Sequence, residues 1–126
     1  MDTQELHDRG LKLRCDLFGA AAVESRVAAL GDFGAPLQHI INAYAYGDVW
    51  SRPGLPMATK SLAMIAMMAA AGKPAELRVH LRGALKNGCT ADEIREILLL
   101  VALYCGIPTA NEAHKAAIDV LRDAGS

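Results

Sequence analysis

Apolar residues recur along the chain at the three- and four-residue spacing of amphipathic helices. In residues 3–18 they stand at Leu6, Gly10, Leu13 and Leu17, which places them on one helical face. No segment combines two-residue alternation with β-branched residues and hairpin turns, so a sheet is not expected. The pattern predicts an all-α bundle of six to seven helices. The candidate helices span residues 3–18, 21–29, 37–46, 59–71, 74–87, 91–104 and 109–122.

Glycine, proline and capping residues set the predicted helix boundaries. Gly47 is expected to end the third helix and Gly88 the fifth, because glycine tolerates the left-handed conformation found after helix ends. Pro74 suits the first turn of a helix, where its missing N–H needs no replacement. Thr90 and Glu93 have the spacing of a capping box, which opens the sixth helix.

Two breaks lie between these helices. Residues 47–56 hold two glycines, two prolines and the chain's only tryptophan, so they predict a loop of fixed geometry. Gly106, Ile107 and Pro108 are expected to end the sixth helix. The helix over residues 59–71 is apolar nearly all round, which is typical of a central helix surrounded by others.

The composition suits one folded domain spanning residues 1–126. Of the 126 residues, 52% are hydrophobic and 21% are charged, which fits one ordinary core and argues against disorder. Only 5% are aromatic, so aliphatic side chains must build the core. A domain this small has more apolar surface than it can easily hide, which favours a homo-oligomer.

Charge and hydropathy exclude several classes of protein. The net charge is −1 and no long basic run exists, so nucleic acid is not an expected partner. The longest apolar stretches, residues 62–72 and 97–107, are shorter than the roughly 20 residues that span a bilayer, so they predict buried helices and no membrane segment. The polar residues 1–8 lack the pattern of a signal peptide, so a cytoplasmic location is expected.

Cysteine and histidine spacing gives no sign of a disulfide framework or a metal site. Cys15, Cys89 and Cys105 include no C-x-x-C pair and are expected to be free and mostly buried. Zinc-type histidine motifs, Gly-x-Gly-x-x-Gly and Walker loops are absent, so neither a metal nor a nucleotide is implied. His39 and His114 are interpreted as packing or interface residues.

Residues 74–87 form the helix with the most chemical promise. Its apolar stripe consists of Leu77, Leu81, Ala84 and Leu85. Arg82 points largely away from this stripe, whereas Glu76 and His80 stack one turn apart along its border. A carboxyl group beside apolar surface holds its proton more tightly and stabilises a charged imidazole nearby, so such a pair can move a proton near neutral pH. The alternative is an ordinary surface pair, which is frequent on helices.

The predicted loop carries groups that suit an anionic ligand. Trp50 supplies a large apolar plate, and Arg52 supplies a planar cation followed by a proline. Arginine recognises carboxylates because its fork donates two parallel hydrogen bonds. Arg78, Arg82 and Lys60 are further candidates. The alternative is a core tryptophan beside solvated cations.

Three stretches of the chain resemble the carboxymuconolactone decarboxylase family. They are residues 46–55 (YGDVWSRPGL), 76–84 (ELRVHLRGA) and 104–111 (YCGIPTAN). The likeness covers nearly the whole chain and implies the AhpD-like helical fold of the alkylhydroperoxidases. Those enzymes carry a C-x-x-C-x-x-x-H motif, and here Lys73 and Glu76 take the two cysteine positions before His80. Dithiol peroxidase chemistry therefore lacks its sulfurs.

The resemblance implies a cofactor-free carboxy-lyase that converts 4-carboxymuconolactone to 3-oxoadipate enol-lactone and CO2 in the β-ketoadipate pathway. It implies Glu76 and His80 as the catalytic positions and a hexamer built as a trimer of dimers. The unsaturated lactone can absorb its own electrons, so no metal or organic cofactor is expected. On this hypothesis Arg52, helped by Arg82 or Lys60, binds the substrate carboxylates. His80 donates a proton or hydrogen bond and Glu76 orients it, although the two roles can be exchanged.

Other interpretations stay open. Trp50 and three methionines, Met64, Met67 and Met68, can form a dry wall of the site or belong to a plain core. The chain can also be a family member that acts on a different carboxylated lactone. A peroxidase-like oxidoreductase and a non-catalytic ligand-binding module on the same fold are the remaining alternatives.

Overall fold

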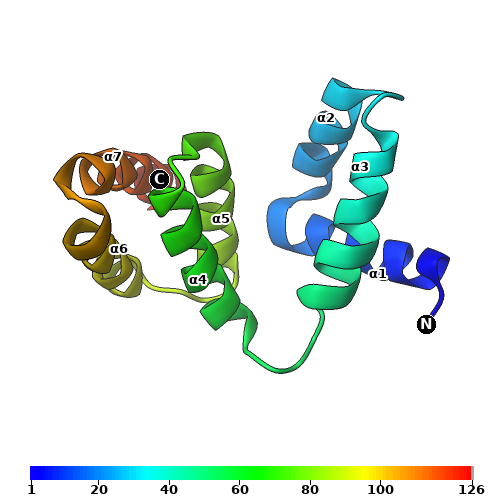
Figure 1. Cartoon of the computed structure of the whole chain (residues 1–126), viewed down its shortest axis with the longest axis horizontal. Helices are drawn as coiled ribbons and strands as arrows, with labels where there is room; N and C mark the ends of the chain where they lie inside the picture. The colour runs from blue at the N-terminus through cyan, green and yellow to red at the C-terminus, as the bar shows by residue number, and fades with distance from the viewer. Residues whose placement is uncertain (126) are drawn as a thin grey trace. The chain divides into compact units, whose positions relative to one another are not determined.

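The computed structural model describes residues 1–125, and within them the chain forms seven α-helices and one π-helix without a strand (Figure 1). The elements are α1 (Thr3–Phe18), α2 (Ala20–Leu30), α3 (Ala35–Ile40), the π-helix η1 (Ile41–Val49), α4 (Met57–Ala70), α5 (Pro74–Lys86), α6 (Ala91–Cys105) and α7 (Ile107–Gly125). The prediction of an all-α fold is confirmed. The helices form two compact units, unit 1 over Met1–Leu55 and unit 2 from Pro56 onward. The single domain over residues 1–126 stays a prediction.

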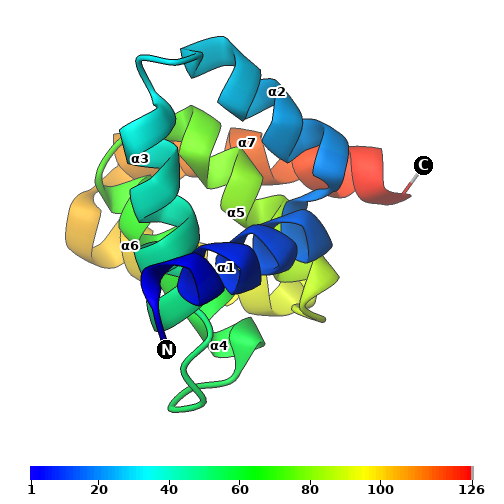
Figure 2. The same ribbon diagram turned by 90° about the vertical axis from the view of Figure 1, so that its right-hand side faces the viewer.

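Unit 1 depends on a close crossing of α1 over η1, which continues directly from α3 (Figure 2). Glycines stand on both sides of this crossing. A Cβ atom on Gly10 of α1 would overlap the backbone of Asn42, and one on Gly47 of η1 would overlap the backbone of Leu6. The two helices can therefore approach to backbone contact only because both positions lack a side chain.

The prediction that the third helix ends at Gly47 is wrong. Gly47 lies inside η1, which continues to Val49 with a π-type hydrogen bond from the Trp50 N–H to the Ala45 carbonyl at 2.8 Å. The Gly47 carbonyl accepts a hydrogen bond from Nε of Arg9 on α1, also at 2.8 Å. This glycine serves the helix crossing rather than a helix end, and the loop begins at Trp50.

Unit 2 is organised around α4, which packs against α5, α6 and α7. Ile65 of α4, Leu81 of α5 and Ile94 of α6 lie in one hydrophobic core and are almost completely buried. The predicted capping box opens α6. The Thr90 hydroxyl accepts from the Glu93 N–H at 3.1 Å, and the Glu93 carboxylate accepts from the Thr90 N–H at 2.8 Å. This boundary prediction is confirmed.

The last helix begins earlier than the sequence predicts. Only Gly106, with a φ of 98°, separates α6 from α7, and α7 begins at Ile107 rather than at Thr109. Pro108 falls in the first turn of α7, where a proline leaves no intrahelical hydrogen bond unmade. The proline was interpreted as a helix breaker, but here it starts a helix.

Several side chains predicted to be buried are exposed. In residues 62–72, Ile65 and Ala69 are buried while Met67 is 51% exposed. In residues 97–107, only one face of α6 is buried. Cys105 is exposed, in contrast to Cys89, whose burial raises the pKa of its thiol. Within residues 1–125 no helix combines the length and hydropathy that a bilayer-crossing segment needs.

Candidate functional site

Helix α5 sets the positions of the predicted acid and imidazole. Pro74 occupies its first position, so Glu76 lies in the first turn, where the helix dipole favours a carboxylate. Leu77, His80 and Leu81 are buried on one face of the helix, and His80 is 6% exposed. Glu76 is exposed. At the predicted border of the apolar stripe, the imidazole of His80 is therefore buried, whereas the carboxyl group of Glu76 is in contact with water.

The cations on α5 lie away from His80. Arg82 follows His80 by two positions, which turns it about 200° around the helix axis. Arg82 lines a cavity of about 280 Å³ together with residues of α7, among them Val120 and Asp123. Arg78 binds Asp119 of α7 at 3.2 Å. Arg82 and His80 consequently stand on different faces of α5.

Lys60 lies in the first turn of α4 and is partly buried. Its neighbour Ser61 is buried, and the Ser61 hydroxyl accepts a hydrogen bond from the Asn87 side-chain amide at 2.8 Å. This contact fixes the start of α4 against the end of α5. Lys60 therefore lies next to a contact between the start of α4 and the end of α5.

The loop of unit 1 presents Trp50 against an aromatic cluster. The Trp50 ring is buried and stacks on Tyr46 of η1, with 5.5 Å between ring centroids and 14° between planes. Phe18 meets the Tyr46 ring edge-on at 5.8 Å. The Ser51 hydroxyl donates to the Tyr46 carbonyl at 2.6 Å. Within unit 1, Trp50 thus anchors the start of the loop.

Arg52 is exposed but firmly oriented by Asp48 of η1. Its Nε donates to one carboxylate oxygen of Asp48 at 2.8 Å, and its Nη2 donates to the other at 3.2 Å. The hydrogen bond holds the pKa of Asp48 below its usual range and raises the pKa of Arg52. Asp48 is not among the site residues that the sequence predicts. Its spacing of four residues from Arg52 would have indicated the pair if the helix had been extended past Gly47.

A second feature that the sequence did not indicate is the buried Arg14 of α1. Its Nη1 donates to the side-chain oxygens of Gln38 at 3.0 Å and Asn42 at 2.7 Å, and its guanidinium lies 5.9 Å from the centroid of the Tyr46 ring. Burial lowers the pKa of Arg14. Arg14 therefore joins α1, α3 and η1, and it contacts the same Tyr46 ring on which Trp50 stacks.

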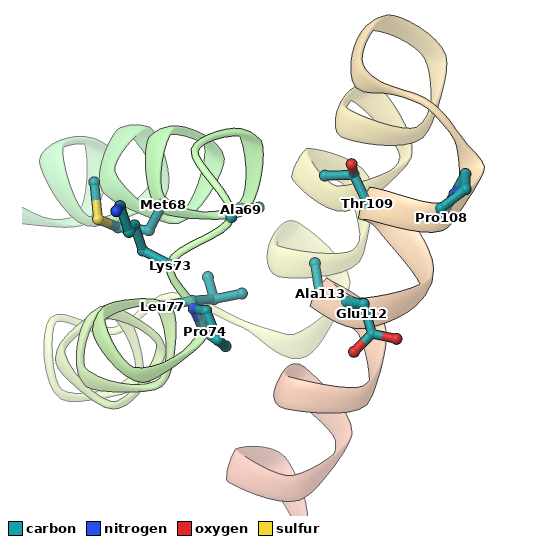
Figure 3. Close-up of a pocket in the computed structure, with 10 residues that line it drawn as sticks. Met68, Ala69, Lys73, Pro74, Leu77, Pro108, Thr109, Glu112 and Ala113 are labelled. Carbon is teal, nitrogen blue, oxygen red and sulfur yellow. The ribbon is translucent and has the colours of Figure 1, made fainter.

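A larger cavity of about 400 Å³ lies in unit 2 (Figure 3). Lys73 and Leu77 lie on one side, and Thr109 and Glu112 of α7 lie on the other. Neither Glu76 nor His80 lines it, nor does either residue line the smaller cavity beside Arg82. Across residues 1–125 no cluster of three or more His, Cys, Asp or Glu side chains is arranged to hold a metal ion.

Comparison with known proteins assigns the family. The model of the carboxymuconolactone decarboxylase family matches residues 35–119, more than half of the chain. The chain belongs to this family. The match crosses the boundary between the two units and includes every predicted site residue. These are Trp50, Arg52, Lys60, Glu76, His80 and Arg82.

Two relatives are similar over most of their length. The 4-carboxymuconolactone decarboxylase of Acinetobacter baylyi is 41% identical over 125 residues, which are 99% of this chain and 93% of the relative. The nitrosuccinic acid decarboxylase of Metarhizium robertsii is 40% identical over 110 residues, 87% of this chain and 77% of the relative. Both relatives are decarboxylases, so the prediction of a carboxy-lyase is confirmed.

Proposed function

We propose that this protein decarboxylates 4-carboxymuconolactone, with CO2 and 3-oxoadipate enol-lactone as products. The similarity to the Acinetobacter baylyi enzyme carries this proposal, because it extends over 99% of this chain and 93% of that enzyme. The fungal relative named for nitrosuccinic acid is matched over a smaller share of both chains. We therefore favour the lactone as substrate and treat nitrosuccinate, another carboxylic acid, as the second candidate.

The proposed substrate supplies its own electron sink. When the bond between its γ-carbon and the carboxylate breaks, the electron pair forms a new β,γ double bond. The electrons of the former α,β double bond move toward the ring carbonyl as a dienolate. A proton added to the α-carbon then gives the enol-lactone. The protein has to bind the carboxylates, stabilise the enolate oxygen and deliver this proton, and no cofactor is required.

The candidate site residues differ in how well their positions suit these tasks. We assign His80 as the proton donor. Its burial keeps water from competing for the proton that the imidazole must deliver to the α-carbon. Glu76, one turn earlier and exposed, sets the charge and orientation of His80 and can exchange protons with solvent. Arg52 binds a substrate carboxylate with its fork oriented by Asp48, and Lys60 is a second cation for the same purpose. Arg82 is the least supported candidate, because it does not share a helix face with His80.

The test is to incubate the purified protein with 4-carboxymuconolactone and, separately, with nitrosuccinate. We expect CO2 release and enol-lactone formation from the lactone, at a higher kcat/KM than from nitrosuccinate. Faster turnover of nitrosuccinate would transfer the assignment to that acid. No turnover of either substrate would overturn the proposal. A thiol-dependent peroxide assay provides the comparison with the peroxidase branch and is expected to show no activity.

We further propose that the protein is a cytoplasmic homo-oligomer, a hexamer built as a trimer of dimers. The homo-oligomer is supported by the large apolar side chains that remain exposed on both units. In unit 1, Phe33 is 98% exposed in the turn before α3, and Leu37 and Ile40 on α3 are half exposed. Large apolar side chains that stay exposed near one another in the sequence are often covered by a protein partner.

A further inference from the structure

Helix α6 is apolar on every side along its second half. Residues 97–104 have the sequence ILLLVALY. Leu98 and Val101 lie in the core of unit 2, at 1% and 4% exposure. The opposite side is apolar as well. We call its members the α6 face, and they are Leu99, Leu100, Leu103, Tyr104 and, at the start of α7, Ile107.

The α6 face is unusually exposed for a surface made of large apolar side chains. Its least exposed member is Leu99, at 50%, and its most exposed is Tyr104, at 81%. Their spacing along α6 places neighbouring members one turn apart on one side of the helix. A helix that is apolar all round normally lies buried between other elements. Within unit 2, one side of α6 therefore lacks the cover that its sequence requires.

The size of the α6 face fits a protein interface. Five large apolar residues at half exposure or more offer roughly 600 Å², the upper limit of the patches usual on monomers. One partner contributes about 800 Å² to an interface of standard size. The α6 face alone would thus supply most of one subunit's share, and the residues around it can supply the rest.

Charge decides between a membrane and a protein as the occupant. A helix that binds a membrane surface carries Lys and Arg beside its apolar face, because that surface is negatively charged. The exposed positions of α6 next to its apolar half carry three acidic side chains, Asp92, Glu93 and Glu96, and one basic side chain, Arg95, which pairs with Asp92. The α6 face therefore suits a protein surface rather than a lipid surface.

A second copy of the chain is the occupant that the face itself favours. Contacts across a two-fold axis place one patch against the same patch, so any charge inside it meets its own like charge. The α6 face has no charged member, and its self-association would bury no unpaired ion. We propose that the α6 face of one subunit packs against the α6 face of another. This inference rests on the homo-oligomer of the proposed function and names the surface that forms it.

Sedimentation equilibrium of two matched variants tests the proposal. Leu103→Lys places a charge in the middle of the face at a position that is 72% exposed in the single chain, so the fold of the subunit should survive. Ile118→Lys is the control, because Ile118 on α7 is 54% exposed and lies outside the face. We expect the Leu103 variant to weaken association by at least about 30-fold, the loss typical of an interface hot spot. The control should associate like the wild type, and circular dichroism should show both variants folded.

Photo-cross-linking identifies the partner surface directly. A benzophenone amino acid at position 103 should form a covalent dimer of the chain, joined at residues 99–107 of the second copy and absent with the probe at position 118. A monomeric wild type, unchanged association of Leu103→Lys, or cross-links from position 103 to any other segment would overturn the proposal. The decarboxylase assay on the same samples separates the two proposals. An active monomer would overturn both the interface and the homo-oligomer but not the enzymatic assignment. An oligomer in which Leu103→Lys associates like the wild type would overturn the interface alone. An inactive oligomer with the expected cross-links would overturn the enzymatic assignment alone.

Discussion

The loop after η1 and helix α5 hold their polar side chains in different ways. Arg52 lies on the surface of unit 1, and two hydrogen bonds to Asp48 fix its direction. His80 is buried in the middle of a regular helix, between Leu77 and Leu81 on its buried face. The first arrangement depends on a specific partner, whereas the second depends on helical periodicity.

The two arrangements differ in the range of the contacts that support them. The burial of His80 follows from the start of α5 at Pro74 and from the helical period of the apolar residues in α5. The loop depends on residues far away in the sequence, because Gly10 and Arg9 of α1 pack against Gly47 of η1. A change in α1 should therefore disturb the loop of unit 1 while leaving α5 intact.

The largest expected effect comes from Gly10→Ala. The added Cβ would overlap the backbone of Asn42, which cannot move aside as a side chain could. We expect a loss of about 3 kcal/mol in the free energy of unfolding, the upper range for overpacking. Urea denaturation measures it. The control is Gly54→Ala, where an added Cβ meets nothing within 4 Å. Equal stability of the two variants would show that the helix crossing is looser than described.

The next effect is that of Arg52→Gln on catalysis. Loss of two charge-assisted hydrogen bonds to a substrate carboxylate, at about 1.5 kcal/mol each, lowers kcat/KM by about 100-fold. Steady-state kinetics with 4-carboxymuconolactone measures the loss. Arg95→Gln is the matched control, because Arg95 is also exposed and paired with a nearby aspartate. Similar kinetics for both variants would show that Arg52 does not bind the substrate.

A smaller effect is expected for Asp48→Asn. The amide keeps one acceptor for Arg52 but loses the ion pair, so we expect KM to rise by about 10-fold with kcat nearly unchanged. Asp16→Asn is the control, because Asp16 forms a comparable exposed pair with Lys12 at 3.0 Å. A fall in KM would mean that Asp48 repels the anionic substrate rather than orienting Arg52.

The smallest effect is the pH dependence of the same ion pair. The pKa of Asp48 is lowered in the folded protein, so the pair is intact above the ordinary carboxyl pKa and is lost as pH falls through the lowered value. The Nε–H NMR signal of Arg52 should persist below about pH 4, the usual range for aspartate. The Asp48→Asn variant should show no such titration. Loss of the wild-type signal at higher pH would contradict the lowered pKa.

Local signals predicted much of the fold. Residues 3–18 were expected to be a helix, and α1 has these bounds. The capping box of Thr90 and Glu93 was predicted from its spacing and is formed. Such features depend on residues within one or two helical turns. The sequence alone is sufficient for them because the residues that decide the structure are neighbours.

Features set by distant contacts were missed. Gly47 was interpreted as a helix end, because its partner at the crossing lies in α1. Arg14 had no local signal for burial, since Gln38 and Asn42, which bind it, belong to α3 and η1. The exposure of Leu103 was missed for a related reason. Its hydrophobicity indicates burial, but the sequence of one chain does not say whether the cover belongs to that chain.

For the candidate site, the sequence supplied the residue types, and their environment came from the structure. His80 and Glu76 were selected together by a spacing of four residues. Only the fold shows that the first is buried and the second is exposed. Asp48 was not selected, because the helix that carries it extends farther than the glycine rule allowed.

The most direct test of the account compares His80→Gln with His114→Gln in the turnover of 4-carboxymuconolactone. His114 lies on α7 with Nδ1 hydrogen-bonded to the Ala110 carbonyl at 2.7 Å, and it has no role in our mechanism. We expect the His80 variant to lose at least about 100-fold in kcat, the usual contribution of a general acid, and the His114 variant to keep the wild-type rate. Wild-type turnover by His80→Gln, with CO2 and enol-lactone still formed, would contradict the claim that His80 delivers the proton.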